Sequence, residues 1–193
     1  MIKHFINLKD IPSKDLKKIL KDAKKRKSSR KNLNTLEVDK GSPLKGKLLI
    51  QMFEKPSLRT RLSFHLAIKQ LGGGTLTLRS NELHLGEGGE TLEDTTKILS
   101  TYGDGFMIRT DSDKKIDNVK KNISIPIVNG LSPSSHPTQI LSDIFDIFIT
   151  CESTVISTLL IFNLSISIQY DQFNIIRNIF CNTFPFTFVV CVS

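Results

Sequence analysis

Short apolar runs alternate with amphipathic stretches between residues 44 and 148. The run from Leu48 to Phe53 predicts a buried strand. Four apolar residues then follow at the i, i+3, i+4, i+7 spacing of one helix face: Phe64, Ala67, Ile68 and Leu71. Further strands are expected at residues 75–78, 105–109 and 124–128, and further helices begin near residues 91, 111 and 137. This alternation predicts an α/β fold with a mostly parallel sheet flanked by helices.

The first forty residues predict one helix and a linking segment. Pro12 and Ser13 have the composition of a helix start. An apolar stripe follows, at Leu16, Ile19, Leu20 and Ala23. Residues 26–35 are polar, so a turn or a frayed helix end is expected there. Later in the chain, the helix that begins after residue 91 is expected to bury Ile98, Leu99 and Tyr102.

The composition changes near residue 148. Residues 151–193 contain three charged side chains, Glu152, Asp171 and Arg177, and sustain neither a helical stripe nor a strand rhythm. Their apolar runs fall short of the ~20 residues that a membrane span needs, so no membrane partner is expected. We therefore expect a domain over residues 1–148 and an irregular tail over residues 149–193 that is not a genuine domain. A frameshift, a truncated gene or a gene-prediction error would produce such a tail.

Charge and cysteine content narrow the function classes. The net charge is +8, and nearly all of the basic excess lies before residue 50. Such an excess suits nucleic acid or the plain basic face of a surface helix. No motif with interleaved aromatic residues supports nucleic acid, which stays the weaker alternative. The three cysteines contain no CxxC pair, so neither zinc nor a disulfide framework is indicated. The first residues lack the apolar core of a secretory signal, and a cytoplasmic location is expected.

The most distinctive stretch is the predicted helix start at residues 57–61. Ser57 is at the N-cap position, and Arg59, Thr60 and Arg61 occupy the first turn. Helix first turns favour Asp and Glu, because free N–H groups and the helix dipole make that end positive. A bound phosphate would resolve the conflict by accepting bonds from backbone N–H groups, the hydroxyls and an arginine. The alternative is a solvated basic helix start with a serine cap.

Two other places offer polar groups at strand ends or helix starts. Arg109 ends a predicted strand, and ligands of open parallel sheets bind beyond the carboxyl ends of strands. His136 and Gln139 are three residues apart, so they share one helix face. Taken alone, Arg109 is an ordinary surface charge and His136 a capping or packed residue. Together with residues 57–61, they would make a site with an anion cradle and several directional donors.

These motifs carry a family resemblance. The sequence Phe-Glu-Lys-Pro-Ser-Leu-Arg-Thr-Arg, residues 53–61, resembles the carbamoyl-phosphate motif of the aspartate and ornithine carbamoyltransferases, with Leu58 where threonine is usual. Met-Ile-Arg-Thr at residues 107–110 is similar to the strand that supplies a carbonyl-binding arginine. Val-Asn-Gly-Leu-Ser at residues 128–132 and His-Pro-Thr-Gln at residues 136–139 are similar to a second signature of the ornithine enzymes.

The resemblance implies a role for each candidate residue. Ser57, Arg59, Thr60 and backbone N–H groups near Leu58 would hold the phosphate of carbamoyl phosphate, while Arg61 would assist or brace the loop. Arg109 and His136 would be catalytic donors to the carbamoyl oxygen. Gln139 would accept from the carbamoyl nitrogen. His84, in the segment 82–86, would reach the site of a neighbouring subunit in a homotrimer.

The implied reaction is transfer of the carbamoyl group to an amine without metal or cofactor. The motifs favour L-ornithine over aspartate, which would give citrulline and phosphate as in arginine biosynthesis. The resemblance covers residues 3–147, and the Ser-Met pair and His-Cys-Leu-Pro loop of the family's acceptor domain do not occur in this sequence. Three alternatives stay open: a truncated ornithine carbamoyltransferase, an inert module that binds carbamoyl phosphate, and an aspartate carbamoyltransferase relative.

Overall fold

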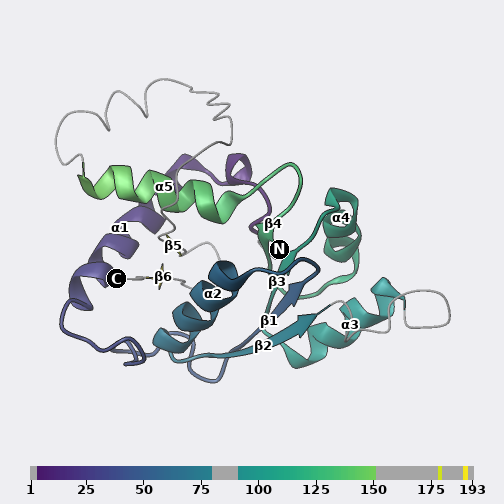
Figure 1. Ribbon diagram of the computed structural model, residues 1–193, viewed down its shortest axis with the longest axis horizontal. Coiled ribbons are helices and arrows are strands. Elements are labelled where there is room, and N and C mark those ends of the chain that lie inside the picture. The colour runs from purple at the N-terminus through teal and green to yellow at the C-terminus, as the bar shows by residue number, and fades with distance from the viewer. Residues whose placement is uncertain (1–3, 80–90, 151–177, 180–188, 191–193) are drawn as a thin grey trace.

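The sheet at the centre of the fold has four parallel strands in the order β2-β1-β3-β4. The computed structural model describes residues 4–79 and 91–150 and two short strands at 178–179 and 189–190 (Figure 1). The four parallel strands are β1 (Leu48–Phe53), β2 (Gly74–Arg79), β3 (Gly105–Arg109) and β4 (Ile127–Leu131). The fold class predicted from the sequence is confirmed. Phe5 adds a single parallel bridge to Val128, beside β4.

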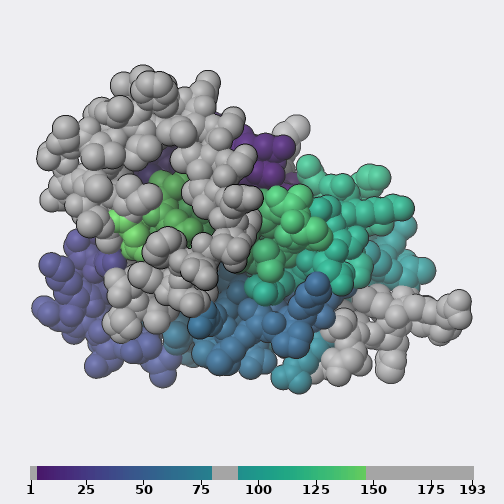
Figure 2. All heavy atoms as spheres, turned by 45° about the horizontal axis from the view of Figure 1, so that its top comes forward, coloured from purple at the N-terminus to yellow at the C-terminus, as the bar shows by residue number. Residues whose placement is uncertain are grey.

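Five α-helices cover the two faces of this sheet. They are α1 (Ser13–Ser29), α2 (Leu58–Gln70), α3 (Leu92–Tyr102), α4 (Asp113–Asn122) and α5 (Pro137–Thr150), and a 3-10 turn, η1 (Leu8–Asp10), precedes them. Because successive strand side chains point to opposite faces, β1 feeds two cores. Leu49 and Phe53 pack with α1, α2 and α5, whereas Ile50 and Met52 pack with α3 and α4. Figure 2 shows α5 in green beside α1 and the first residues of the chain.

Helix α2 forms where the periodicity places it. Phe64, Ala67, Ile68 and Leu71 are all buried, as the stripe predicts. Gly72 ends the helix with a backbone φ of +86°, a left-handed conformation that glycine adopts at little cost. The chain then turns directly into β2.

Two local expectations are wrong: the buried face of α3 and the first residue of β4. In α3, Ile98 and Tyr102 are 46% and 71% exposed, and Thr95 and Thr96 are buried instead. Burial of Thr96 is tolerated because its hydroxyl donates to the carbonyl oxygen of Leu92. The last parallel strand begins at residue 127 rather than 124, after Pro126, which has no N–H to donate to a ladder.

Strand β4 continues through Asn129 and Gly130 to Leu131, whereas the expected strand ends at residue 128. Asn129 is fully buried there, and its amide nitrogen donates to the carbonyl oxygens of Ile6 and Ser135 at 3.1 and 3.3 Å. It also donates to the Ser132 hydroxyl at 3.2 Å. These bonds satisfy the amide nitrogen, whereas the buried Oδ1 of Asn129 has no hydrogen-bond partner among the described residues.

The segment after α1 is held by buried charge. The helix extends to Ser29, so the turn expected at residues 26–35 begins later than predicted. Arg30 forms a buried ion pair with Asp39 and donates to the carbonyl oxygens of Asn34 and Glu37 at 3.2 and 3.0 Å. Arg26 also reaches Asp39, at 3.2 Å.

Little of the expected tail falls within the described residues. Strands β5 (Asn178–Ile179) and β6 (Val189–Val190) pair antiparallel. The rest of residues 151–193 lies outside the part of the chain that the structure describes, and the boundary proposed between residues 148 and 149 falls within α5. Among the helices described, none combines the length and apolar character needed to cross a membrane.

Candidate functional site

The candidate residues gather where the strand order reverses. From β1 the chain passes to β2 on one side, and it later returns to β3 on the other side of β1. In open α/β sheets, ligands bind at such a point, in the crevice beyond the carboxyl ends of the strands. Residues 54–57 follow β1, and Arg109 ends β3 beside Phe53.

The start of α2 has the features of an anion cradle. Ser57 is the N-cap residue with extended backbone, and its hydroxyl makes no capping hydrogen bond to the first turn. That turn holds no acidic residue. The positive end of the helix is therefore neutralised neither by a serine cap nor by an acidic side chain of its own first turn.

Arg109 reaches this helix start from the neighbouring strand. Its Nη1 donates to Thr60 Oγ1 at 3.2 Å. Its Nε is buried and has no hydrogen-bond partner among the described residues. Burial lowers the pKa of the guanidinium, yet an arginine stays charged at neutral pH. A half-buried cation with an unsatisfied donor is suited to hold an oxygen of a small anionic molecule.

His136 completes the cluster from the loop before α5. Burial and the positive charge of Arg109 lower the pKa of its imidazole from 6.5 to about 4, so it is neutral at pH 7. Its Nδ1 lies 3.0 Å from Thr138 Oγ1. When that hydroxyl donates to Nδ1, the ring proton is on Nε2, which is then a neutral hydrogen-bond donor.

Gln139 lies one turn further along α5. Its Nε2 donates to Asp143 Oδ1 at 2.8 Å, which orients the amide. An amide held by its nitrogen can offer its oxygen as an acceptor. This arrangement suits the acceptor role predicted for Gln139.

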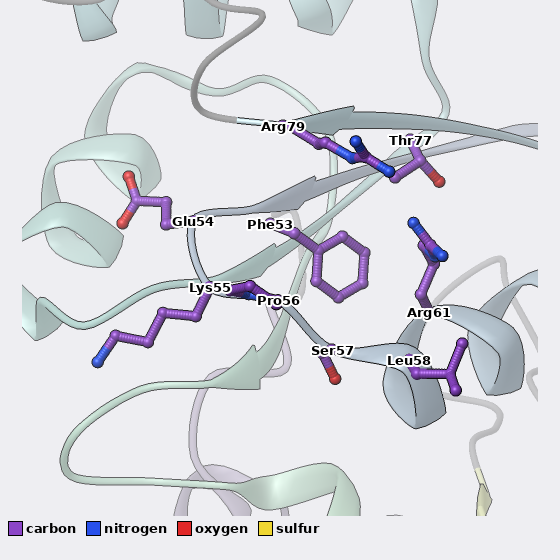
Figure 3. A pocket seen from close by; sticks show the side chains of 9 residues that line it. All are labelled: Phe53, Glu54, Lys55, Pro56, Ser57, Leu58, Arg61, Thr77 and Arg79. Carbon is purple, nitrogen blue, oxygen red and sulfur yellow. The ribbon is translucent and has the colours of Figure 1, made fainter.

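A hollow of about 510 Å³ opens on the β2 side of the helix start. Among the predicted residues, Ser57, Leu58 and Arg61 line it, whereas Arg109, His136 and Gln139 do not. The hollow and the Arg109 cluster thus flank the α2 start, since β2 and β3 lie on opposite sides of β1. Figure 3 shows Arg61 extending from α2 toward Thr77 and Arg79 of β2.

The sequence interpretation missed Thr77 and Arg79. Arg79 pairs in register with Phe53 at the carboxyl end of β2, so it lies beside the last residue of β1. The rule that identified Arg109 also applies to Arg79, but the expected strand ended one residue earlier. His84 lies outside the described residues. Within the described part of the chain, no group of three or more His, Cys, Asp or Glu side chains could hold a metal ion.

Comparison with known proteins identifies the family to which this fold belongs. Residues 3–148 match the family model of the aspartate/ornithine carbamoyltransferase, carbamoyl-P binding domain. The chain is 43% identical over 143 residues to ornithine carbamoyltransferase of Brucella ovis, covering 74% of this chain and 44% of that protein. It is 44% identical over 144 residues to the Rhizobium meliloti enzyme, with 75% and 46% covered. The chain thus spans less than half the length of these relatives.

Solved structures of both acceptor types share the fold. Ornithine carbamoyltransferase from Pyrococcus furiosus superposes with a TM-score of 0.70 at 36% identity, covering 77% of this chain and 46% of that one. The catalytic subunit of M. jannaschii aspartate transcarbamoylase gives 0.66 at 33% identity, with 78% and 48% covered. With its sheet, its helix start and its match over residues 3–148, the chain belongs to the aspartate/ornithine carbamoyltransferase family.

Proposed function

We propose that this protein is of the ornithine carbamoyltransferase type and moves the carbamoyl group of carbamoyl phosphate to L-ornithine, giving citrulline and phosphate. The observation that carries the proposal is the hydrogen bond from Arg109 to Thr60, with neutral His136 beside Arg109. It brings a guanidinium and an imidazole to the edge of a helix start suited to phosphate.

In this proposal, the phosphate lies at the first turn of α2. Backbone N–H groups near Leu58, the hydroxyls of Ser57 and Thr60, and the Arg59 guanidinium hold its oxygens. Arg61 assists from the side of the hollow, where Figure 3 shows its side chain. The helix dipole and the arginines favour a dianion there, and they stabilise the phosphate as it leaves.

The carbamoyl end lies toward β3 and α5. Arg109 and the Nε2–H of His136 donate to the carbonyl oxygen, and the Gln139 amide oxygen accepts from the carbamoyl nitrogen. The amine in its neutral form attacks the carbamoyl carbon, and the bond from that carbon to the phosphate oxygen breaks. Phosphate leaves with that electron pair and takes up the proton that the new carbamoyl nitrogen loses. Donors aimed at the developing oxyanion contribute about 3 kcal/mol each, a factor of a hundred or more in rate.

The acceptor and the assembly are proposed on narrower grounds. The motifs around residues 53–56 and 128–132 favour ornithine, and the curated relatives described above carry that name. We further propose a cytoplasmic homotrimer in which His84 of one subunit reaches the next. A second candidate is a module that binds carbamoyl phosphate without turnover, because the family match lies in the carbamoyl-P binding domain.

Calorimetry of carbamoyl-phosphate binding tests the cradle. Arg59→Ala should abolish measurable binding, because it removes a charged donor from the phosphate. Lys69→Ala is the matched control, since Lys69 is an exposed cation in the last turn of the same helix. Unchanged affinity in a folded Arg59→Ala variant would refute the cradle assignment.

A product assay separates the candidates for the acceptor. Citrulline formation at saturating ornithine would support the transferase and exclude the inert module. Carbamoyl-aspartate formation in its place would shift the assignment to the aspartate branch. Binding without either product would leave the module as the function of this chain.

A further inference from the structure

Glu54 joins the loops that follow β1 and β3. Its backbone N–H donates to the carbonyl oxygen of Arg109 at 3.0 Å. Its carboxylate accepts a hydrogen bond from Thr110 Oγ1 at 2.5 Å and pairs with Lys115 Nζ at 2.5 Å. The Glu54 side chain is 9% exposed and Thr110 is 3% exposed, so water competes weakly for these contacts.

The groups that hold Glu54 are themselves fixed. Thr110 Oγ1 accepts from the backbone N–H of Ser112 at 3.2 Å. Ser112 is the N-cap of α4, and its hydroxyl accepts from the backbone N–H of Lys115 at 3.3 Å. The Glu54 carboxylate is therefore anchored to a capped helix start.

Glu54 is placed to fix the distance between Arg109 and the start of α2 rather than to bind a ligand. Lys55 and Pro56 are the two residues between it and Ser57, and proline restricts the backbone of that short connection. On the other loop, Thr110 directly follows Arg109. Glu54 is among the residues that line the hollow, but Figure 3 shows its carboxylate directed away from the Phe53 ring and from Arg61.

We propose that Glu54 is a positioning residue that holds Arg109 at the correct distance from the helix start. Its bonds to Thr110 and Lys115 fix the two sides of the crevice, so that one small molecule can contact both the first turn of α2 and the Arg109 guanidinium. This inference rests on the proposed function, because it assumes that the phosphate end meets α2 and the carbamoyl end meets Arg109.

Comparing two ligands isolates this role. Inorganic phosphate needs the helix start alone, whereas carbamoyl phosphate also uses Arg109. Glu54→Gln removes the charge that holds Lys115, so the affinity for carbamoyl phosphate should fall by about tenfold or more. The affinity for inorganic phosphate should stay near that of the wild type. Calorimetry on the full chain, with freshly prepared carbamoyl phosphate and with inorganic phosphate, measures the ratio of the two affinities.

Asp104 provides a control at the amino ends of β1 and β3, opposite the carboxyl ends where Glu54 lies. It joins the same two strands, accepting from Lys47 Nζ at 2.8 Å and from the backbone N–H of Leu48 at 2.9 Å. Asp104→Asn therefore removes a more exposed ion pair at the amino ends of the same two strands, and it should leave the ratio of the two affinities unchanged. Thr110→Val should lower that ratio, and Thr110→Ser, which keeps the hydroxyl, should restore it.

Each outcome decides one question. A selective loss of carbamoyl-phosphate affinity in Glu54→Gln, with Asp104→Asn unaffected, supports the positioning role. Equal losses for both ligands, or an unchanged ratio, would overturn it while leaving the proposed function intact. A wild-type chain that binds carbamoyl phosphate no better than inorganic phosphate would overturn the proposed function, and the positioning role with it.

Discussion

Acidification tests the buried, neutral state of His136. Burial and the charge of Arg109 lower its pKa from 6.5 to about 4 in the folded chain. In the unfolded chain, the same imidazole takes up a proton near its ordinary pKa. The folded state therefore loses no stability through this group above about pH 6.5 and loses it progressively as the pH falls toward 4.

The size of the loss follows from the two pKa values. One pKa unit corresponds to about 1.4 kcal/mol. The full difference amounts to about 3 kcal/mol, of which about 2 kcal/mol is lost between pH 7 and pH 5. Asp104 and Asp113, whose pKa values are lowered from 3.8, titrate below this interval and do not contribute.

Urea unfolding at pH 7 and pH 5 measures the effect. The wild type should lose about 2 kcal/mol more of its free energy of unfolding over this interval than His136→Gln does. His65→Gln is the control, since it replaces an exposed histidine of α2 and should leave the pH dependence as in the wild type. If His136→Gln and the wild type show the same pH dependence, His136 is not held neutral, and its role as a neutral donor is refuted.

Three other changes test particular residues. Leu58→Thr places a hydroxyl beside the helix start, at a side chain that is 65% exposed, so the stability should change little. Calorimetry should show phosphate binding a few-fold tighter, and weaker binding would contradict the placing of phosphate there. Thr138→Val removes the hydroxyl facing His136 Nδ1 and should shift the ring tautomer, which ¹⁵N NMR detects; an unchanged tautomer would exclude Thr138 as its determinant. Gly72→Ala forces an alanine to φ +86° with its Cβ 2.9 Å from Ser42 Cβ, so thermal unfolding should show that the free energy of unfolding falls by about 1–3 kcal/mol. Gly74→Ala is the control and should be tolerated, because its Cβ would lie no nearer than 3.6 Å to another atom.

Local pattern was sufficient to predict most elements of the fold. The helical stripe of α2 and the apolar run of β1 depend on spacing within a few residues, and both are where the sequence places them. Tyr102 and Asn129 show the limit of this reasoning. Tyr102 is exposed and Asn129 is buried because of tertiary neighbours, which no local window contains.

The candidate site could be predicted in its parts but not in its arrangement. The arginine-rich helix start and the strand-end arginine are visible in the sequence. Arg109 meets Thr60, 49 residues earlier in the chain, only because β3 lies beside β1. Arg79 was missed because a strand boundary was placed one residue short, and a boundary is the least certain part of such a prediction.

The Arg30–Asp39 pair changes how the basic excess of the chain is to be counted. Formal charge treats every lysine and arginine before residue 50 as available to attract a polyanion. Arg30 is buried, and both it and Arg26 are already committed to Asp39, which anchors a connection without regular secondary structure to the end of α1. Replacing Arg30 by lysine would preserve the net charge but lose the forked contacts to Asn34 and Glu37. Part of the positive charge of this protein therefore stabilises its own fold and is not available to attract a partner in solution.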